Sequence, residues 1–294
     1  MKKTRDEKLL DHALAIGNVE AQEAGTMAFS ARAMVMATLP YRDPGDIPYF
    51  GRENGGYTLF IEPGFDYRRK KSLGYPYGNI PRLLLAWLTT EATRTKCKTL
   101  EMGKSLTNFL SQMGLSATGG KKGSIPRVRN QLNRFFGSRF GCHYHGPGRE
   151  AAKQFQVMVE KNYWWNPLQP DDSGQWYSEI VLGDEFFQEI IARPVPLDLR
   201  VIRAIKKSPM ALDIYAWLTY RMSYLKRKTT IPWRALALQF GSDFARLRDF
   251  KKSFLEQLAV VKLLYCHARF STESVRGLTL YPSRPQVLPA NQVP

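Results

Sequence analysis

Hydrophobic residues recur at helical spacing in two stretches of the chain that lie 130 positions apart. The apolar face of the first predicted helix contains Ile80, Leu83, Leu84, Trp87 and Leu88, and that of the second contains Ala211, Ile214, Tyr215, Leu218 and Met222. The tetrapeptide Ala-Trp-Leu-Thr occurs in both helices, and the same offset matches Leu106 with Leu236. A constant offset over this length indicates two copies of one module.

The pattern after each of these helices predicts the same order of elements in both copies. In the first copy we predict an extended segment at Lys98–Met102, a second helix that ends at Gly114, a third helix from about Ser124, and strands at Phe155–Val159 and Tyr177–Leu182. In the second copy the corresponding elements are an extended segment at Thr229–Ile231, a helix that ends at Gly241, a helix from about Asp243, and strands at Lys262–Phe270 and Gly277–Tyr281. We expect both glycines to take a positive φ at the helix ends. This order is typical of the winged helix-turn-helix. The predicted fold is therefore α+β, with two tandem winged helix-turn-helix domains and a short N-terminal extension.

The third helix of each copy has an apolar face and a basic, polar face. The residues expected to point inward are Val128, Leu132, Phe135 and Phe136 in the first copy, and Leu247, Phe250, Phe254 and Leu258 in the second. A winged helix-turn-helix lays this helix in the major groove of DNA, so we expect the polar faces and the adjoining turns to bind DNA. The candidate DNA-binding residues are Lys121, Lys122, Arg127, Arg129, Asn130, Asn133, Arg134, Lys228, Arg234, Arg246, Arg248, Lys251 and Lys252. Lysine and arginine neutralise phosphates, and arginine and asparagine also recognise base edges.

The charge of the chain supports this interpretation. Lys and Arg number 43 against 26 Asp and Glu, a net charge of +17. Residues 121–161 hold nine basic and two acidic residues, and residues 200–252 hold thirteen and three, so the rest of the chain is neutral. Such concentration indicates a polyanionic partner bound through two surfaces. The alternative is that the basic faces are simply solvated.

Motifs for enzymatic chemistry are absent from the sequence. The segment 119–124 lacks the spacing of a phosphate-binding loop, and no metalloprotease or serine hydrolase motif occurs. His143 and His145 resemble the metal-binding pair of His-x-His nucleases that nick DNA through a tyrosine, so a nickase stays open as an alternative. We expect no catalytic residues, no metal and no cofactor. Three cysteines without a CxxC pair indicate reduced thiols in a cytoplasmic protein, and no apolar run reaches the ~20 residues of a membrane span.

The remaining segments suggest how the domains are divided. Residues 5–24 are predicted to form a polar helix with Leu9, Leu10, Ala13 and Leu14 on one side. The apolar residues 27–39 and a strand at 57–61 either complete the first core or form a two-fold contact between copies. Arg68–Lys71 belongs to a solvated linker or to an arm that follows a DNA backbone. Prolines at 194 and 196 mark the domain joint. The predicted domains are an extension packed on the first module (1–75), two winged-helix domains (76–195 and 196–285) and an extended tail (286–294).

Three stretches carry a family resemblance. Met34–Gly45, Pro76–Ala92 and Ser208–Arg221 resemble the RepA-type replication initiators of bacterial plasmids. The resemblance implies a protein that binds repeated origin sites (iterons) in double-stranded DNA, opens the adjacent duplex, and engages the host initiator and the replicative helicase. It also implies copy control through homodimers that repress the protein's own promoter.

The leading hypothesis is therefore a non-enzymatic, sequence-specific plasmid replication initiator. A winged-helix repressor without initiator activity uses the same residues, and the sequence separates the two only through the resemblance. The metal-dependent nickase is the third alternative.

Overall fold

The computed structural model describes residues 4–103, 106–119, 123–163, 178–241 and 244–287 of the chain. Within them, two units repeat one order of elements. The first unit contains α3 (Asn79–Thr95), β6 (Thr99–Glu101), α4 (Leu106–Gln112), α5 (Ser124–Gly137), β9 (Met158–Tyr163) and β10 (Ser178–Leu182). The second contains α8 (Pro209–Tyr224), β12 (Thr229–Pro232), α9 (Trp233–Phe240), α10 (Leu247–Leu264), β13 (Arg269–Ser271) and β14 (Gly277–Tyr281). The strands pair in equivalent antiparallel orders, β6-β10-β9 and β12-β14-β13, so the repeat extends to the sheets.

The shared tetrapeptide has the same packing role in both units. The Trp87 ring meets Phe109 of α4 edge-on at 5.0 Å between centroids, and the Trp217 ring meets Phe240 of α9 in the same way at 5.5 Å. Thr89 and Thr219, the last residues of the tetrapeptide in α3 and α8, are both buried. The sequence repeat therefore encodes one hydrophobic core built twice, and the α+β class is confirmed.

A four-stranded antiparallel sheet adjoins the first unit, with two strands from before α3 and two from between α5 and β9. Its order is β2 (Phe50–Asn54), β3 (Tyr57–Glu62), β7 (Arg139–Gly146) and β8 (Arg149–Gln156), and a small hairpin of β4 (Gly64–Asp66) and β5 (Lys71–Gly74) follows β3. The prediction of a single strand over Phe155–Val159 is wrong, because the chain bends at Val157 and passes from β8 to β9. Local alternation continues through the bend, so the pattern alone does not reveal that the two strands belong to different sheets.

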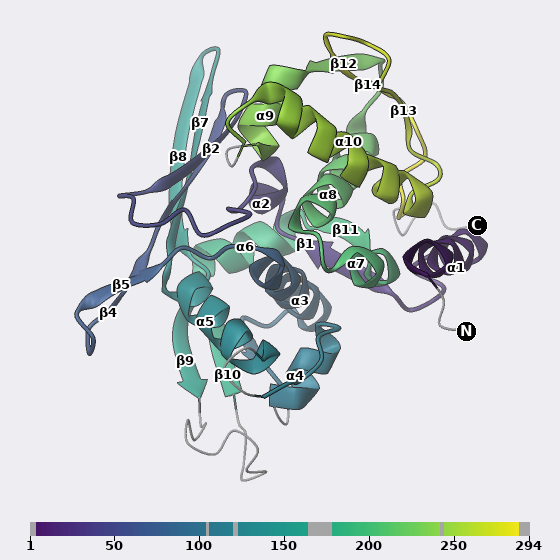
Figure 1. Cartoon of the computed structure of the whole chain (residues 1–294). Helices are drawn as coiled ribbons and strands as arrows, with labels where there is room; N and C mark the ends of the chain where they lie inside the picture. The colour runs from purple at the N-terminus through teal and green to yellow at the C-terminus, as the bar shows by residue number, and fades with distance from the viewer. Residues whose placement is uncertain (1–3, 104–105, 120–122, 164–177, 242–243, 288–294) are drawn as a thin grey trace.

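The N-terminal segment contacts both units. Strand β1 (Met27–Ser30) pairs antiparallel with β11 (Val195–Asp198), which contains the predicted joint, and the two strands lie between the units in Figure 1. Helix α1 (Arg5–Asn18) packs on α10 and on α7 (Leu199–Ile205), so the expectation that the whole extension packs on the first module is wrong for this helix. The predicted domain boundaries themselves stay a prediction.

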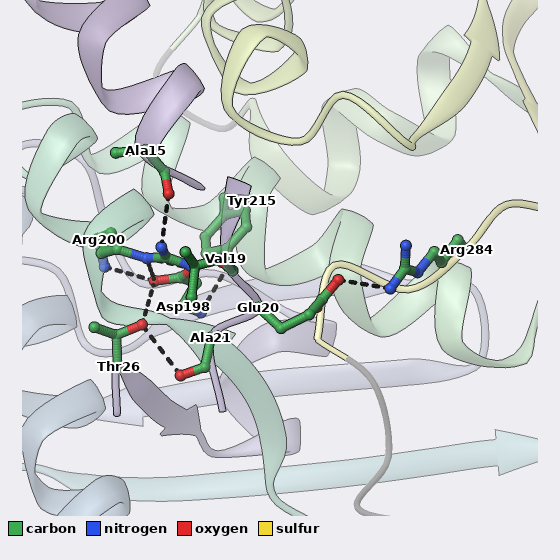
Figure 2. Close-up of polar contacts among 9 residues, drawn as sticks. All are labelled: Ala15, Val19, Glu20, Ala21, Thr26, Asp198, Arg200, Tyr215 and Arg284. Carbon is green, nitrogen blue, oxygen red and sulfur yellow. Dashed lines mark hydrogen bonds and ion pairs between the residues drawn. The ribbon is translucent and has the colours of Figure 1, made fainter. Parts of the chain in front are cut away.

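Two polar links fasten α1 to the second unit. The Arg200 guanidinium donates to the carbonyls of Ala15 and Val19 at 2.9 and 2.7 Å while it is held by the buried Asp198 carboxylate (Figure 2). Farther along, Arg284 forms an ion pair with Glu20 at 2.6 Å. The last turn of α1 is thus anchored through its free carbonyl groups.

The inward face of α1 also differs from the predicted one. Leu9 and Ile16 are buried against the second unit, whereas Leu10 and Leu14 are 52% and 67% exposed. A helix of 100° per residue cannot turn positions 9, 10 and 14 to one narrow contact, and the neighbouring α7 and α10 select positions 9 and 16.

The apolar residues 27–39 lie in the interior of the chain. Met34 belongs to the core of the first unit and Val35 to that of the second, on either side of the short helix α2 (Arg32–Met36). Leu59 and Ile61 of β3 are fully buried in the first core, which also contains Phe186 and Ile190 of α6 (Asp184–Ala192). These side chains complete the cores of both units, so they are not free to form the two-fold contact between copies that was the other alternative.

The start and end of α10 differ from the sequence expectation. The helix begins at Leu247 and runs to Leu264, so Lys262 is helical and not part of a strand. Leu247 is 43% exposed, because Phe244 packs on Phe250 at 5.9 Å between ring centroids and covers that end of the core. Gly114 has the expected positive φ of 69°, but Gly241 has a φ of −117°, so the second glycine is not required for a left-handed cap.

Candidate nucleic-acid interface

Helix α5 presents its predicted polar face on the surface of the first unit. Val128, Leu132, Phe135 and Phe136 are buried, as expected. On the opposite side Arg127 and Asn130 are exposed, and Arg129 and Asn133 are half-buried. Burial lowers the pKa of the Arg129 guanidinium from its usual value, and an arginine remains charged at neutral pH. Lys121 and Lys122 lie outside the described residues.

Arg134, another predicted DNA contact, is mostly buried and contacts residues of its own chain, and its contact with DNA stays a prediction. Its Nη1 donates to Asp43 Oδ2 at 2.7 Å and to the Tyr75 carbonyl at 3.1 Å, and its guanidinium lies over the Tyr77 ring at 5.2 Å. The side chain is only 16% exposed. Arg134 therefore holds the connector before α3 against α5 through its Nη1 group.

Helix α10 carries the corresponding basic face of the second unit. Arg246 occupies the N-cap position, and Arg248 and Lys252 are exposed in the first and second turns of the helix. Arg248 Nε lies 3.5 Å from Asp249 Oδ1, with 74% of its side chain exposed, so this ion pair is screened by water. Lys251 is half-buried with its Nζ 4.8 Å from the centre of the Trp233 ring. The free end of α10 thus presents a cluster of cations.

The loop and hairpin next to α10 extend this basic surface. Lys228 and Arg234, both predicted contacts, are exposed, and Lys228 Nζ lies 5.6 Å from the centre of the Tyr281 ring. Three further exposed arginines were not predicted: Arg227 precedes β12, Arg269 is the first residue of β13, and Arg276 directly precedes β14. The sequence pattern could have predicted the two hairpin arginines, because the hairpin of a winged helix is expected to follow the DNA backbone.

The His-x-His pair, His143 and His145, lies on β7. Among the described residues, no three His, Cys, Asp or Glu side chains are placed to hold a metal ion. His143 lies on β7 with its ring 5.5 Å from that of Phe60. On the opposite face of the same strand, burial raises the pKa of the Cys142 thiol to about 11, although its hydrogen bond with Tyr57 lowers this pKa.

In the described part of the chain, no helix is long and apolar enough to cross a membrane.

A buried ion pair joins the two units at their centre. The Arg82 guanidinium of α3 makes two hydrogen bonds of 2.7 Å to the Asp213 carboxylate of α8. It also donates to the carbonyls of Leu39, Pro40 and Gly78, and it lies over the Tyr41 ring at 5.0 Å. The three stretches that carried the family resemblance therefore meet at this one guanidinium.

Further hydrogen bonds hold the units together around this ion pair. Asn79 Nδ2 donates to the Lys206 carbonyl at 2.8 Å. Thr38 Oγ1 donates to the Gln239 carbonyl at 3.0 Å, and Gln239 Nε2 donates back to the Met36 carbonyl at 2.8 Å. The relative position of α5 and α10 is thus fixed by a polar, buried contact in addition to the connecting strand.

Comparisons with known proteins agree with this arrangement. The family model described as "Plasmid encoded RepA protein" matches residues 75–234, which include α3, α5 and α8. A crystal structure of RctB domains 2–3 superposes with a TM-score of 0.52 at 13% identity, covering 84% of this chain and 94% of that one. A selenomethionine form of RctB domains 2 and 3 gives 0.53 at 12% identity, covering 87% and 99%. At these identities the likeness establishes the fold. No curated protein matches the sequence.

Proposed function

The chain belongs to the family of plasmid-encoded RepA proteins, which are replication initiators, and from this premise we propose that it initiates replication by binding repeated sites in the duplex DNA of a plasmid origin. The two repeated units act as winged helix-turn-helix modules, with α5 and α10 in successive major grooves. The observation that carries the proposal is that the third helix of each unit presents exposed cations beside a buried apolar stripe.

The strand topology supports the winged-helix assignment. In each unit the strand between the first two helices pairs with the last strand, which in turn pairs with the strand after the third helix. This leaves the last two strands as a hairpin beside the third helix, the place from which a wing contacts the backbone. Arg269 and Arg276 are exposed in that hairpin of the second unit.

The contact between the units supports one continuous binding site. Because the Arg82–Asp213 ion pair and its surrounding hydrogen bonds fix α3 against α8, the two helices α5 and α10 cannot choose independent sites. Equivalent groove faces recur every ~10.5 bp, so a footprint of roughly two turns is expected. Footprinting that protects only one turn would contradict this arrangement.

Binding to an origin fragment tests the proposal directly. Replacing Arg248 and Lys252 by alanine should reduce affinity for the fragment and lower the slope of log K against log salt by about 1 per lost phosphate contact. Arg94, an exposed arginine on α3 outside the proposed interface, is the matched control and should leave the slope unchanged. Equal effects of both changes would show that the charge acts without a specific surface.

Replication in trans distinguishes an initiator from a repressor of the same fold. An origin fragment that replicates only when this protein is supplied supports initiation, with duplex opening and engagement of the host initiator and replicative helicase as its later steps. Repression of a reporter without replication would support the repressor. We propose that the chain acts by binding, without catalysis, in the bacterial cytoplasm where plasmid DNA resides.

Control of copy number through homodimers remains part of the proposal. The residues first considered for a two-fold contact are buried in the cores, so a dimer would use another surface or a rearranged N-terminal segment. Light scattering over a concentration series measures the state directly. A strict monomer at high micromolar concentration would remove dimerisation and leave the DNA-binding proposal intact.

A further inference from the structure

The outer face of the four-stranded sheet is shaped around a flat aromatic ring. Along β3, Tyr57, Leu59 and Ile61 point into the core, so Phe60 points outward. Phe60 pairs with Gly51 on one side and with Gly141 on the other. A Cβ atom at Gly141 would lie 1.9 Å from Phe60 Cζ, so the ring lies directly across the neighbouring strand where any larger residue would displace it. The glycine is thus required for this flat surface.

Three further aromatic side chains near this face are open to solvent, one just before β2 and two in the β4–β5 hairpin. Tyr49 is 61% exposed, Phe65 49% and Tyr67 85%. Phe65 and Tyr67 contact each other edge-on at 5.4 Å, and they belong to the hairpin that projects beyond the sheet at the left of Figure 1. Between the sheet and this hairpin lies an open groove of about 910 Å³, lined by Tyr49, Phe60, Phe65 and His143. A folded chain seldom leaves so many aromatic rings together in water without a partner.

The charge of the hairpin indicates which partner fits. Four consecutive exposed cations, Arg68–Lys71, span its turn and the first residue of β5. Asp66 pairs with Arg69 and Glu62 with Arg139, both at 3.8 Å, which balances the acids of this face. Within the described residues, Arg68, Lys70 and Lys71 have no carboxylate at salt-bridge distance. The groove therefore combines exposed aromatic rings with excess positive charge.

We propose that this groove, formed by the outer face of β2, β3 and β7 and by the β4–β5 hairpin, binds single-stranded DNA. Unpaired bases would stack on Tyr49, Phe65 and Tyr67, and the hairpin turn would contact the phosphates. Aromatic rings beside a basic groove are the general means of binding single strands, because every base has a face on which to stack. In a duplex these faces are covered by neighbouring base pairs, so the groove favours the open form.

The groove is separate from the proposed duplex contacts of α10. In Figure 1 the β4–β5 hairpin and α10 lie on opposite sides of the molecule, whereas the hairpin packs against α5. A strand leaving a duplex held at α5 would thus meet the groove without crossing the second unit. The proposal rests on the sheet face alone, so single-strand binding and duplex binding can fail independently.

Fluorescence anisotropy with a labelled dT20 oligonucleotide and the full-length protein tests the stacking. Combining Phe65→Ala with Tyr67→Ala should raise the Kd for dT20 at least tenfold and leave the Kd for an origin duplex within twofold. A tenfold change is about 1.4 kcal/mol, which is one lost base stack. Tyr144→Ala is the matched control, because Tyr144 is 44% exposed on the other face of β7 and should have no effect.

Salt dependence and crosslinking test the position of the strand. Arg68→Gln with Lys71→Gln should lower the slope of log K against log salt for dT20 by about 1.4, since each phosphate contact to a single strand contributes ~0.7. Photo-crosslinking to an oligonucleotide containing 5-iodouracil should attach Tyr49, Phe65 or Tyr67.

Four results would overturn the proposal. They are no binding of dT20 by the unchanged protein, unchanged dT20 binding by the double aromatic variant, a parallel loss of duplex binding, or crosslinks confined to other segments. Light scattering separates the remaining case: if the unchanged protein forms a dimer that the aromatic variant loses, the face is a contact between copies and the single-strand assignment is wrong.

Discussion

Replacing Arg82 by methionine tests whether the buried ion pair holds the two units together. Methionine keeps much of the volume of the side chain but removes the charge and every donor. All five N–H groups of the guanidinium are used, two toward Asp213 and the others toward the carbonyls of Leu39, Pro40 and Gly78. The side chains of Arg82 and Asp213 are only 6% and 10% exposed.

The expected loss follows from the charge that remains. Methionine would leave the Asp213 carboxylate buried without its partner, and removal of one member of a buried pair costs about 3–5 kcal/mol of unfolding free energy. Arg94→Met is the matched control on the same helix, because its ion pair with Glu91 is on the surface, and it should produce no measurable change. Combining Arg82→Met with Asp213→Leu removes both charges and should recover ~2 kcal/mol relative to the sum of the single changes.

Urea unfolding followed by tryptophan fluorescence measures these differences, since Trp87 and Trp217 lie at equivalent places in the two units. A footprint on origin DNA should also shorten in the Arg82→Met protein if the units move apart. A loss below 1 kcal/mol, or strict additivity in the double variant, would refute the assignment of this ion pair as the joint between the units.

Three further outcomes are expected. Arg248→Ala should weaken binding to the preferred site by about 1–3 kcal/mol and relax base preference, as measured by selection from a random duplex library; unchanged preference would remove α10 from the major groove. Arg134→Gln should instead lower stability by about 1 kcal/mol and leave base preference unchanged, because its partners lie within the chain. Burial raises the pKa of the Cys142 thiol to about 11, so its thiolate appears only as the pH rises toward that value. At pH 8 iodoacetamide should modify the exposed Cys97 and Cys266 first, and equal labelling of all three by mass spectrometry would contradict the buried position of Cys142.

The repeated core could be predicted from the sequence because its signal is local. Helical spacing around Trp87 and Trp217 and a constant offset report the same packing twice. The four-stranded sheet could not, because β3 and β7 are about 80 positions apart and each has an alternating pattern that fits several partners. The pairing cannot be predicted because the two strands are far apart in the sequence, whatever the composition of either strand.

The polar face of a helix shows a similar limit. Arg127 and Arg134 both lie outside the apolar stripe of α5, so periodicity alone treats them alike. Only Asp43 and Tyr75, brought in from an earlier segment, distinguish the solvent-facing arginine from the one that holds the connector. A list of interface residues drawn from helical spacing therefore includes side chains with a structural role.

The pairing of β1 with β11 has a consequence for synthesis on the ribosome. Residues 27–30 pair with residues 195–198, which are translated much later. The apolar side of α1 packs on α10 at 247–264, which is translated later still. At ~5–20 residues per second, the interval between translation of Leu9 and of Leu258 is about 12–50 s. Until its end, Leu9 and Ile16 lack the side chains of α10 that cover them in the folded chain. The early segment therefore exposes apolar side chains while the rest of the chain is synthesised, and slower elongation would lengthen this exposure.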